Sequence, residues 1–255
     1  MRDILNTKEV YSLDSGTYYF DIEKSPTRVW SYKKYDTNVF EEEEDWHIQS
    51  VAWKKAGEKT VHCVMLPDFK LYKTEPHNDY ELVKYIYDNI FKKATILVGH
   101  NINKFDVRMC KHRFMIHGFA PLGKLRTRDT LTMARKFGFF YNSLDNTCRE
   151  LGLPGKLEEG AGSLWKRCYN GDMKAWKLMA KYNKNDVYIN ELLDRRLLIW
   201  EDTTPALHSH KDKCPMCRGT NFKRNGMKYG RGWEQQRYAC LTCGFANIYS
   251  DKFKV

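Results

Sequence analysis

Four acidic residues and one tyrosine, divided among three segments, constrain this chain of 255 residues more than any other feature. The first segment, residues 17–23, is a mostly apolar run rich in aromatic residues, which predicts a β-strand. Side chains two positions apart on a strand point to the same face, so Asp21 and Glu23 project together. Two neighbouring carboxylates repel each other, and a divalent cation between them removes the repulsion. Their hard oxygen ligands suit Mg²⁺ or Mn²⁺. The alternative is an exposed acidic pair at a strand end.

The second acidic segment follows another apolar run, residues 95–100. A helix is expected to begin near Asn103 and to carry Asp106 in its first turn, where the helix dipole favours a negative charge. Asp106 taken alone also fits an ordinary first-turn aspartate. His100 and Asn101 precede this helix and are candidates for contact with a substrate.

The third segment places a carboxylate on the apolar stripe of a helix. From residue 182 onward the stripe repeats with the 3.6-residue period of an α-helix. Its members are Tyr182, Asp186, Ile189, Leu193, Leu197 and Trp200. A charge on a core-facing stripe is costly unless it is paired or binds a metal, so Asp186 is a metal ligand or the partner of a Lys or Arg. Tyr182 lies one turn away on the same face, and its hydroxyl can reach the same site.

In this order the segments resemble the three motifs of the DEDD family of 3′–5′ exonucleases, Asp-x-Glu, Asn-x-x-x-Phe-Asp and Tyr-x-x-x-Asp. That family belongs to the ribonuclease H-like superfamily and includes the proofreading domains of DNA polymerases. The resemblance covers residues 13–200, and Tyr182 is typical of the DEDDy branch. Segments at 129–131 and 143–153 also look like parts of such nucleases. The resemblance implies an α/β fold, a mixed sheet flanked by helices, with the first motif on the central strand.

The resemblance also implies hydrolysis of phosphodiester bonds at a 3′ end by two cations. Asp21, Glu23 and Asp186 would hold a first cation, which activates a water. Asp21, aided by Asp106 through waters, would hold a second cation, which stabilises the leaving 3′-oxygen. Tyr182 would orient the attacking water. Single-stranded DNA is the favoured substrate and RNA the alternative. The competing hypothesis is a non-catalytic nucleic-acid-binding or adaptor protein that uses the exonuclease fold as a platform.

Within residues 13–200 the sequence predicts strands first and helices later, an order typical of a mixed sheet flanked by helices. Strands are expected at 17–23, 27–35, 48–55 and 95–100. Helices are expected at 79–92, from 103 onward, and at 128–134, 143–151, 161–168, 173–181 and 182–200. Ser143 should cap its helix and Gly152 should end it. The acidic run 41–45 is expected to be a solvent-exposed loop.

The net charge and the hydropathy of the chain indicate which kinds of partner it binds. The formal net charge of +11 and the pI near 9.1 favour a polyanionic partner, most simply nucleic acid. The sequence has no run of eighteen apolar residues and no apolar stretch near its beginning, so no membrane association is expected. A cytoplasmic, reducing location is therefore predicted, which for a viral protein is the host cytoplasm. The expected domains are a nuclease at 1–203, a linker at 204–213 and a zinc ribbon at 214–255.

The expected zinc ribbon rests on two C-x₂-C pairs separated by 22 residues. The four cysteines are Cys214, Cys217, Cys240 and Cys243. In a reducing compartment this spacing predicts one structural Zn²⁺ held by four thiolates, with a hairpin at 221–238 between the pairs. A redox or iron–sulfur site is the alternative. Four thiolates leave no open coordination position, so this zinc should not be catalytic.

The same part of the chain is strongly basic. Residues 204–255 contain ten Lys and Arg against three acidic residues. Five of the basic residues alternate with aromatic residues, a mixture that suits phosphate contact and base stacking. These candidate nucleic-acid contacts are Lys223, Arg224, Lys228, Arg231 and Arg237. Two alternatives are a ribbon whose charges only keep it in solution and a ribbon that docks onto a protein partner.

Overall fold

The computed structural model describes residues 16–32, 39–123, 125–157, 163–198, 200, 220–230, 232–242, 244, 248–249 and 253–254. The chain divides into two compact units. One comprises residues 15–197, and the other holds the described residues from 198 onward. Among the described residues, no helix has the length and apolar character needed to cross a lipid bilayer.

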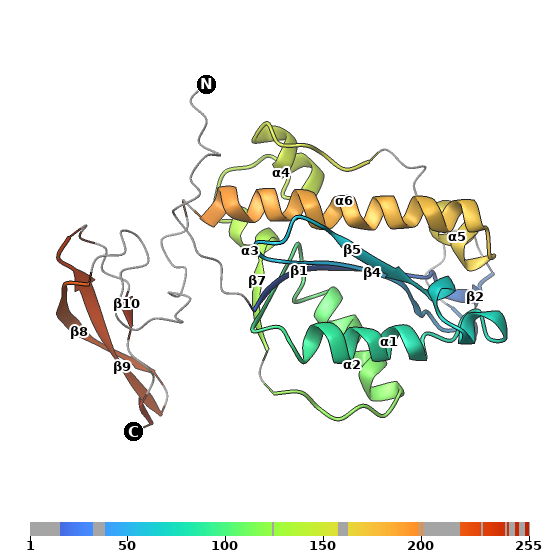
Figure 1. Cartoon of the computed structure of the whole chain (residues 1–255), viewed down its shortest axis with the longest axis horizontal. Helices are drawn as coiled ribbons and strands as arrows, with labels where there is room; N and C mark the ends of the chain where they lie inside the picture. The colour runs from blue at the N-terminus through green and yellow to red at the C-terminus, as the bar shows by residue number, and fades with distance from the viewer. Residues whose placement is uncertain are drawn as a thin grey trace. The chain divides into compact units, whose positions relative to one another are not determined.

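The first unit is built on a five-stranded mixed sheet in the order β5-β4-β1-β6-β7 (Figure 1). Its strands are β1 (Thr17–Lys24), β4 (Ile48–Lys55), β5 (His62–Met65), β6 (Ile96–Gly99) and β7 (Arg126–Asp129). The first half is antiparallel, because β4 pairs antiparallel with both β1 and β5. The second half is parallel, because β6 pairs parallel with β1 and β7. The strand with the first acidic pair is therefore central, as expected.

Helices cover both faces of this sheet (Figure 1). The long helix α6 lies across one face with α4, while α1 and α2 lie against the other. The helices are α1 (Tyr80–Ile86), α2 (Asp106–Ile116), α3 (Thr130–Ala134), α4 (Leu144–Glu150), α5 (Ser163–Tyr169) and α6 (Met173–Leu198). Shorter turns are η2 (Leu66–Asp68), η3 (Leu71–Lys73) and the π-helical η4 (Tyr87–Phe91), which continues α1. The predicted mixed sheet flanked by helices is confirmed.

The period-2 alternation of β1 explains why its acids share one face. Tyr18, Phe20 and Ile22 are buried in the main hydrophobic cluster with residues of α1 and α2. Asp21 and Glu23 point to the opposite face, toward α6. Apolar burial on one face of the strand thus determines where its carboxylates project.

A stripe of buried polar side chains ties α6 to the sheet. Asn183, Asp186, Asn190 and Asp194 recur every three or four residues, so they line one side of the helix. Arg128 donates two hydrogen bonds to Asp194, of 2.7 and 2.6 Å. Each such contact restrains the rotation and position of the helix, and with it the side chain of Asp186.

Several boundaries differ from the sequence prediction. Residues 173–198 form one helix rather than two, because no Gly or Pro interrupts them. The stripe from Tyr182 ends at Leu197, and Trp200 lies beyond the helix with 69% of its surface exposed. Strands β5 and β7 were not predicted, and β7 takes the place of the first residues of the helix expected at 128–134. Ser143 caps α4 as predicted, with its hydroxyl oxygen accepting from Asn146 N at 3.3 Å.

The acidic run is a strand and not the expected loop. Strand β3 (Glu41–Glu44) pairs antiparallel with β2 (Arg28–Trp30) in a separate two-stranded ribbon. Arg28 and Glu43 form an ion pair of 2.8 Å across the two strands. The acidic run by itself does not indicate this attraction, because the arginine lies in another segment. The strand predicted at 27–35 is accordingly short in the described part and does not join the main sheet.

The second unit contains the predicted hairpin, formed by β8 (Phe222–Gly230) and β9 (Trp233–Cys240). The short strands β10 (Ile248–Tyr249) and β11 (Phe253–Lys254) pair with β9. Cys240 is buried at the end of β9, against Phe222 and Tyr238. Cys214, Cys217 and Cys243 lie outside the described residues, so the zinc site stays a prediction.

Candidate active site

The carboxylates gather at the carboxyl end of the parallel strands. The pairing of β1 with β6 ends at Tyr19 and Val98, so Asp21 and Glu23 extend past it. This edge of a parallel sheet is where binding sites form in α/β proteins. Gly99 lets the strands close up there, because a Cβ at that position would lie 3.0 Å from the Phe20 carbonyl oxygen.

The structure brings together the carboxylates predicted from the sequence. One oxygen from each of Asp21, Glu23 and Asp186 lies within 4.8 Å of the others, a spacing that can hold a metal ion. Asp106 is buried at the first residue of α2, and its Oδ1 accepts a hydrogen bond from Ile22 N at 3.0 Å. Asp106 therefore contacts β1 at the residue that lies between Asp21 and Glu23.

Two side chains hold the acidic pair of β1 in place. Asn183 Nδ2 donates to Asp21 Oδ2 at 2.6 Å, and Trp165 Nε1 donates to Glu23 Oε2 at 2.7 Å. Neither residue was singled out from the sequence. Asn183 carries a readable signal, since it is a polar residue on the buried side of α6, adjacent to Tyr182. Trp165 carries none, because an apolar residue on a short helix is ordinary.

Lys156 is the third residue that the sequence did not reveal. Its Nζ donates to Asp186 Oδ2 at 2.6 Å and to the Tyr182 hydroxyl at 3.1 Å. Burial lowers the pKa of Lys156, but the attraction to Asp186 and these hydrogen bonds outweigh it and raise the pKa above its usual value. Asp186 thus has a Lys partner, which was the alternative to metal binding. The other oxygen, Oδ1, is buried and has no hydrogen-bond partner among the described residues.

The electrostatics of the cluster favour protonation or a cation. Burial raises the pKa of Asp21 well above its usual range, and repulsion from Asp106, Glu23 and Asp186 adds to it. Burial raises the pKa of Glu23 and that of Asp106 to about 7, and it raises that of Asp186 as well. One lysine does not balance four carboxylates. The oxygen donors and the orphaned Asp186 Oδ1 fit a hard divalent cation such as Mg²⁺ or Mn²⁺.

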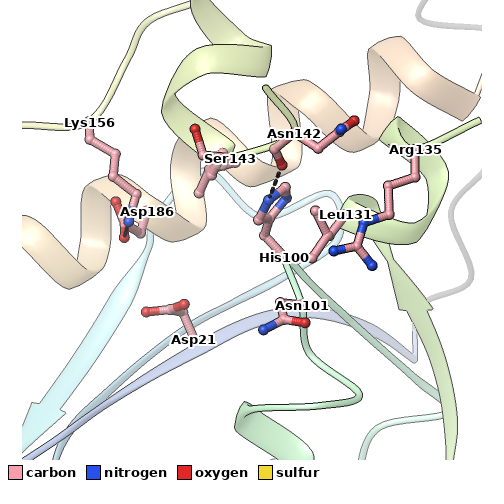
Figure 2. Close-up of a pocket in the computed structure, with 10 residues that line it drawn as sticks. Asp21, His100, Asn101, Leu131, Arg135, Asn142, Ser143, Lys156 and Asp186 are labelled. Atoms are coloured by element: carbon pink, nitrogen blue, oxygen red, sulfur yellow. Dashed lines mark hydrogen bonds and ion pairs between the residues drawn. The ribbon is translucent and has the colours of Figure 1, made fainter. Parts of the chain in front are cut away.

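A cleft of about 510 Å³ opens onto these carboxylates. Its lining residues are Asp21, His100, Asn101, Leu131, Arg135, Asn142, Ser143, Leu144, Lys156 and Asp186. Figure 2 shows Lys156 and Asp186 at one end, Arg135 at the other, and Asp21 and Asn101 between them. A cleft of this size accommodates a ligand such as a nucleotide.

The wall of the cleft near Asn101 is held rigidly. Asn101 adopts a left-handed backbone conformation (φ 67°), and its N–H donates to Asp129 Oδ1 at 2.9 Å. Such a conformation is uncommon outside glycine and is often found at functional sites. His100 Nε2 donates to the Asn142 carbonyl oxygen at 2.9 Å, and burial lowers the pKa of His100 to about 4. The imidazole therefore serves as a neutral link between the two sides of the cleft.

The other residues that the sequence predicts to contact nucleic acid lie in the second unit. Lys223, Arg224 and Lys228 are exposed on β8, and Arg237 on β9 is partly buried, with its Nε donating to the Asn225 carbonyl oxygen at 3.1 Å. Arg231 lies outside the described residues. The role of these residues in nucleic-acid binding stays a prediction.

We expect divalent cations to stabilise the protein at pH 8 and much less at pH 5. The raised carboxyl pKa values mean that the metal-free folded state binds more protons than the unfolded state between about pH 4 and pH 7. Its free energy of unfolding therefore falls as the pH rises through this window, and a bound cation restores it above pH 7. At a cation concentration of 100 Kd the gain is about 2.7 kcal/mol, or roughly 5–10 °C in Tm.

Thermal melts with EDTA or MnCl₂ at the two pH values measure this effect. Asp21→Asn is the matched variant, because it removes one carboxylate and keeps the side-chain shape. An equal Mn²⁺-induced rise in Tm for the variant and the wild type at pH 8 would place the cation elsewhere.

Comparison with known proteins agrees with this geometry. A family model described as RNase_H superfamily matches residues 54–198, which include Asp106, Tyr182 and Asp186 but begin after Asp21 and Glu23. Among solved structures, the chain is similar to a family B DNA polymerase from the hyperthermophilic archaeon Pyrobaculum calidifontis, with a TM-score of 0.52 and 16% identity.

That similarity covers 71% of this chain and 24% of the polymerase chain, so this protein corresponds to about a quarter of the length of the polymerase. At this identity the likeness establishes the fold. No curated protein sequence matches the chain. The family model spans more than half of the chain and includes strands β5 to β7 and the helices that carry Asp106 and Asp186. The protein therefore belongs to the RNase H superfamily.

Proposed function

We propose that this protein is a metal-dependent 3′–5′ exonuclease that hydrolyses phosphodiester bonds of nucleic acid, with single-stranded DNA as the favoured substrate and RNA as the alternative. The convergence of Asp21, Glu23 and Asp186 within 4.8 Å carries the proposal. Two segments far apart in sequence, β1 and α6, form this cluster, and Asp106 approaches it from a third segment. Burying several carboxylates together costs free energy unless a bound cation offsets their charge.

Asp21, Glu23 and Asp186 would hold one cation, and Asp21 with Asp106 would hold a second. When bound, such cations supply an activated water and stabilise charge on the leaving oxygen. The protein side chains prepare this site. Asn183 and Trp165 fix the acidic pair through their hydrogen bonds.

Tyr182 would orient the attacking water. Lys156 holds the Tyr182 hydroxyl and offsets part of the charge on Asp186. A cation that binds at Asp186 must share that carboxylate with Lys156 or displace it. The orphaned Oδ1 offers a second oxygen for this purpose.

Nucleic acid as the substrate is supported by the net charge of +11 and by the fold shared with part of a DNA polymerase. The release of nucleotides from a 3′ end rests on the motif resemblance. In the second unit, Cys214, Cys217, Cys240 and Cys243 would hold a structural Zn²⁺. The exposed basic residues of β8 would then bind the substrate strand or a protein partner.

A gel time course with 5′-labelled single-stranded DNA and RNA tests the proposal. Reactions contain Mg²⁺, Mn²⁺ or EDTA. We expect a ladder that shortens one nucleotide at a time from the 3′ end with either cation and no cleavage with EDTA. The faster ladder identifies the preferred nucleic acid. Binding of both strands without cleavage under any condition would instead support a platform protein.

A further inference from the structure

Arg135 is a cation at the end of the cleft opposite the carboxylates (Figure 2). Its side chain is exposed and makes no hydrogen bond or ion pair with any residue that the structure describes. Lys156, the other cation of the cleft, differs because Asp186 and Tyr182 already bind it. The guanidinium of Arg135 therefore keeps its donors for a ligand.

The surroundings of Arg135 do not neutralise it. The nearby His100 is neutral, since it is buried and bonded to the Asn142 carbonyl. The Asp129 carboxylate accepts hydrogen bonds from four backbone N–H groups, those of Asn101, Asn103, Leu131 and Thr132. The hydrogen bonds from Leu131 and Thr132 cap α3, the helix that Arg135 follows directly, and so restrain the backbone from which Arg135 projects. A guanidinium with unused donors on a restrained backbone is suited to phosphate.

The proposed reaction determines which phosphate of the substrate Arg135 can bind. When a terminal nucleotide is removed, the scissile phosphate lies at the carboxylate cluster. The released nucleotide carries no phosphate beyond the scissile one, whereas the retained strand carries one for every further nucleotide. A cation that binds a second phosphate must therefore lie on the side of the retained strand.

The side of the site away from Arg135, beyond Glu23, is acidic and does not favour phosphate. Trp165 of α5 binds Glu23, and Tyr169 at the end of the same helix donates to Glu44 of β3. Strand β3 presents four glutamates in a row, three of them exposed. Arg28 offsets only part of this charge, so the β3 side of the site is more acidic than the Arg135 end, and a polyanionic strand is favoured toward Arg135.

We propose that Arg135 forms a subsite for the phosphate on the 5′ side of the scissile phosphate, an inference that rests on the proposed exonuclease function. Arg135 is a positioning residue that binds the retained strand and takes no part in the chemistry at the scissile bond. The site therefore distinguishes substrates by length, because a dinucleotide has only the scissile phosphate and a trinucleotide has one more.

Steady-state hydrolysis of a dinucleotide and a trinucleotide by wild type and Arg135→Ala tests the subsite. We expect the variant to lose about tenfold in kcat/KM on the trinucleotide, the size of one exposed charge-assisted contact, and nothing on the dinucleotide. Arg126→Ala is the matched control, since Arg126 is exposed at the start of β7 and does not line the cleft. Equal losses on both substrates, or no loss on either, would overturn the proposal.

Binding without catalysis separates this inference from the proposed function. Fluorescence anisotropy of a labelled single-stranded hexanucleotide in EDTA gives Kd at several salt concentrations. We expect Arg135→Ala to weaken binding by about tenfold and to reduce the slope of log Kd against log salt by about 0.7, as for one lost phosphate contact. An unchanged Kd and slope would exclude the subsite even if hydrolysis is confirmed. A wild type that hydrolyses no substrate would refute the exonuclease, while this measurement still decides the role of Arg135.

Discussion

Asp21→Asn is expected to lower kcat for nucleic-acid hydrolysis by at least about 10³-fold, while the Kd for a single-stranded oligonucleotide changes little. Asp21 is the carboxylate that both proposed cations share, so its loss removes ligands from each. Metal stabilisation of the reacting oxygens is worth several kcal/mol, and each 1.36 kcal/mol is tenfold in rate. The substitution keeps the side-chain shape, and its amide oxygen can still accept a hydrogen bond from Asn183.

Single-turnover hydrolysis in Mg²⁺ and oligonucleotide binding in EDTA measure the two quantities separately. Asp88→Asn is the control, because Asp88 is a surface carboxylate that pairs with Lys84 and Lys92 away from the cleft. Folding of the Asp21 variant should not suffer, since it removes a carboxyl group whose pKa burial has raised. Hydrolysis at the wild-type rate by the folded variant would refute the assignment of the site.

Asp194→Ala is expected to lower the free energy of unfolding by about 3–5 kcal/mol, the typical cost of breaking a buried ion pair by removing one partner. Asp194 is fully buried and accepts hydrogen bonds from the Arg128 guanidinium and from the Tyr19 hydroxyl at 2.9 Å. Its removal leaves Arg128 charged and buried without a counterion. Because Asp194 lies two turns from Asp186 on α6, the variant should also lose activity.

Urea denaturation followed by far-UV circular dichroism measures this loss, with Asp88→Ala as a surface control of little expected effect. A second variant separates charge from packing. Replacing Arg128 by methionine and Asp194 by leucine together should be much less destabilising than Asp194→Ala, because no unpaired charge remains buried. A double variant as unstable as the single one would show that packing around α6, and not the ion pair, supports the helix.

The sequence by itself determined which residues carry the candidate chemistry. The alternation of β1 was sufficient to place Asp21 and Glu23 on one face, since apolar residues on the other face must be buried. The helical period likewise placed Asp186 on the buried side of α6. Both patterns are local, and local periodicity is what a sequence displays directly. The acidic strand β3 was mistaken for a loop because its stability comes from pairing with β2 rather than from its composition.

Only the tertiary structure decided what surrounds those carboxylates. Lys156 reaches Asp186 across 30 positions and Trp165 reaches Glu23 across 142, and no local pattern encodes such distances. The same holds for Arg135, which directly follows α3 and lines the cleft together with residues of β1 and α6 that are distant in sequence. Side chains that act through space are determined by the packing of distant segments, and periodicity along one segment does not specify that packing.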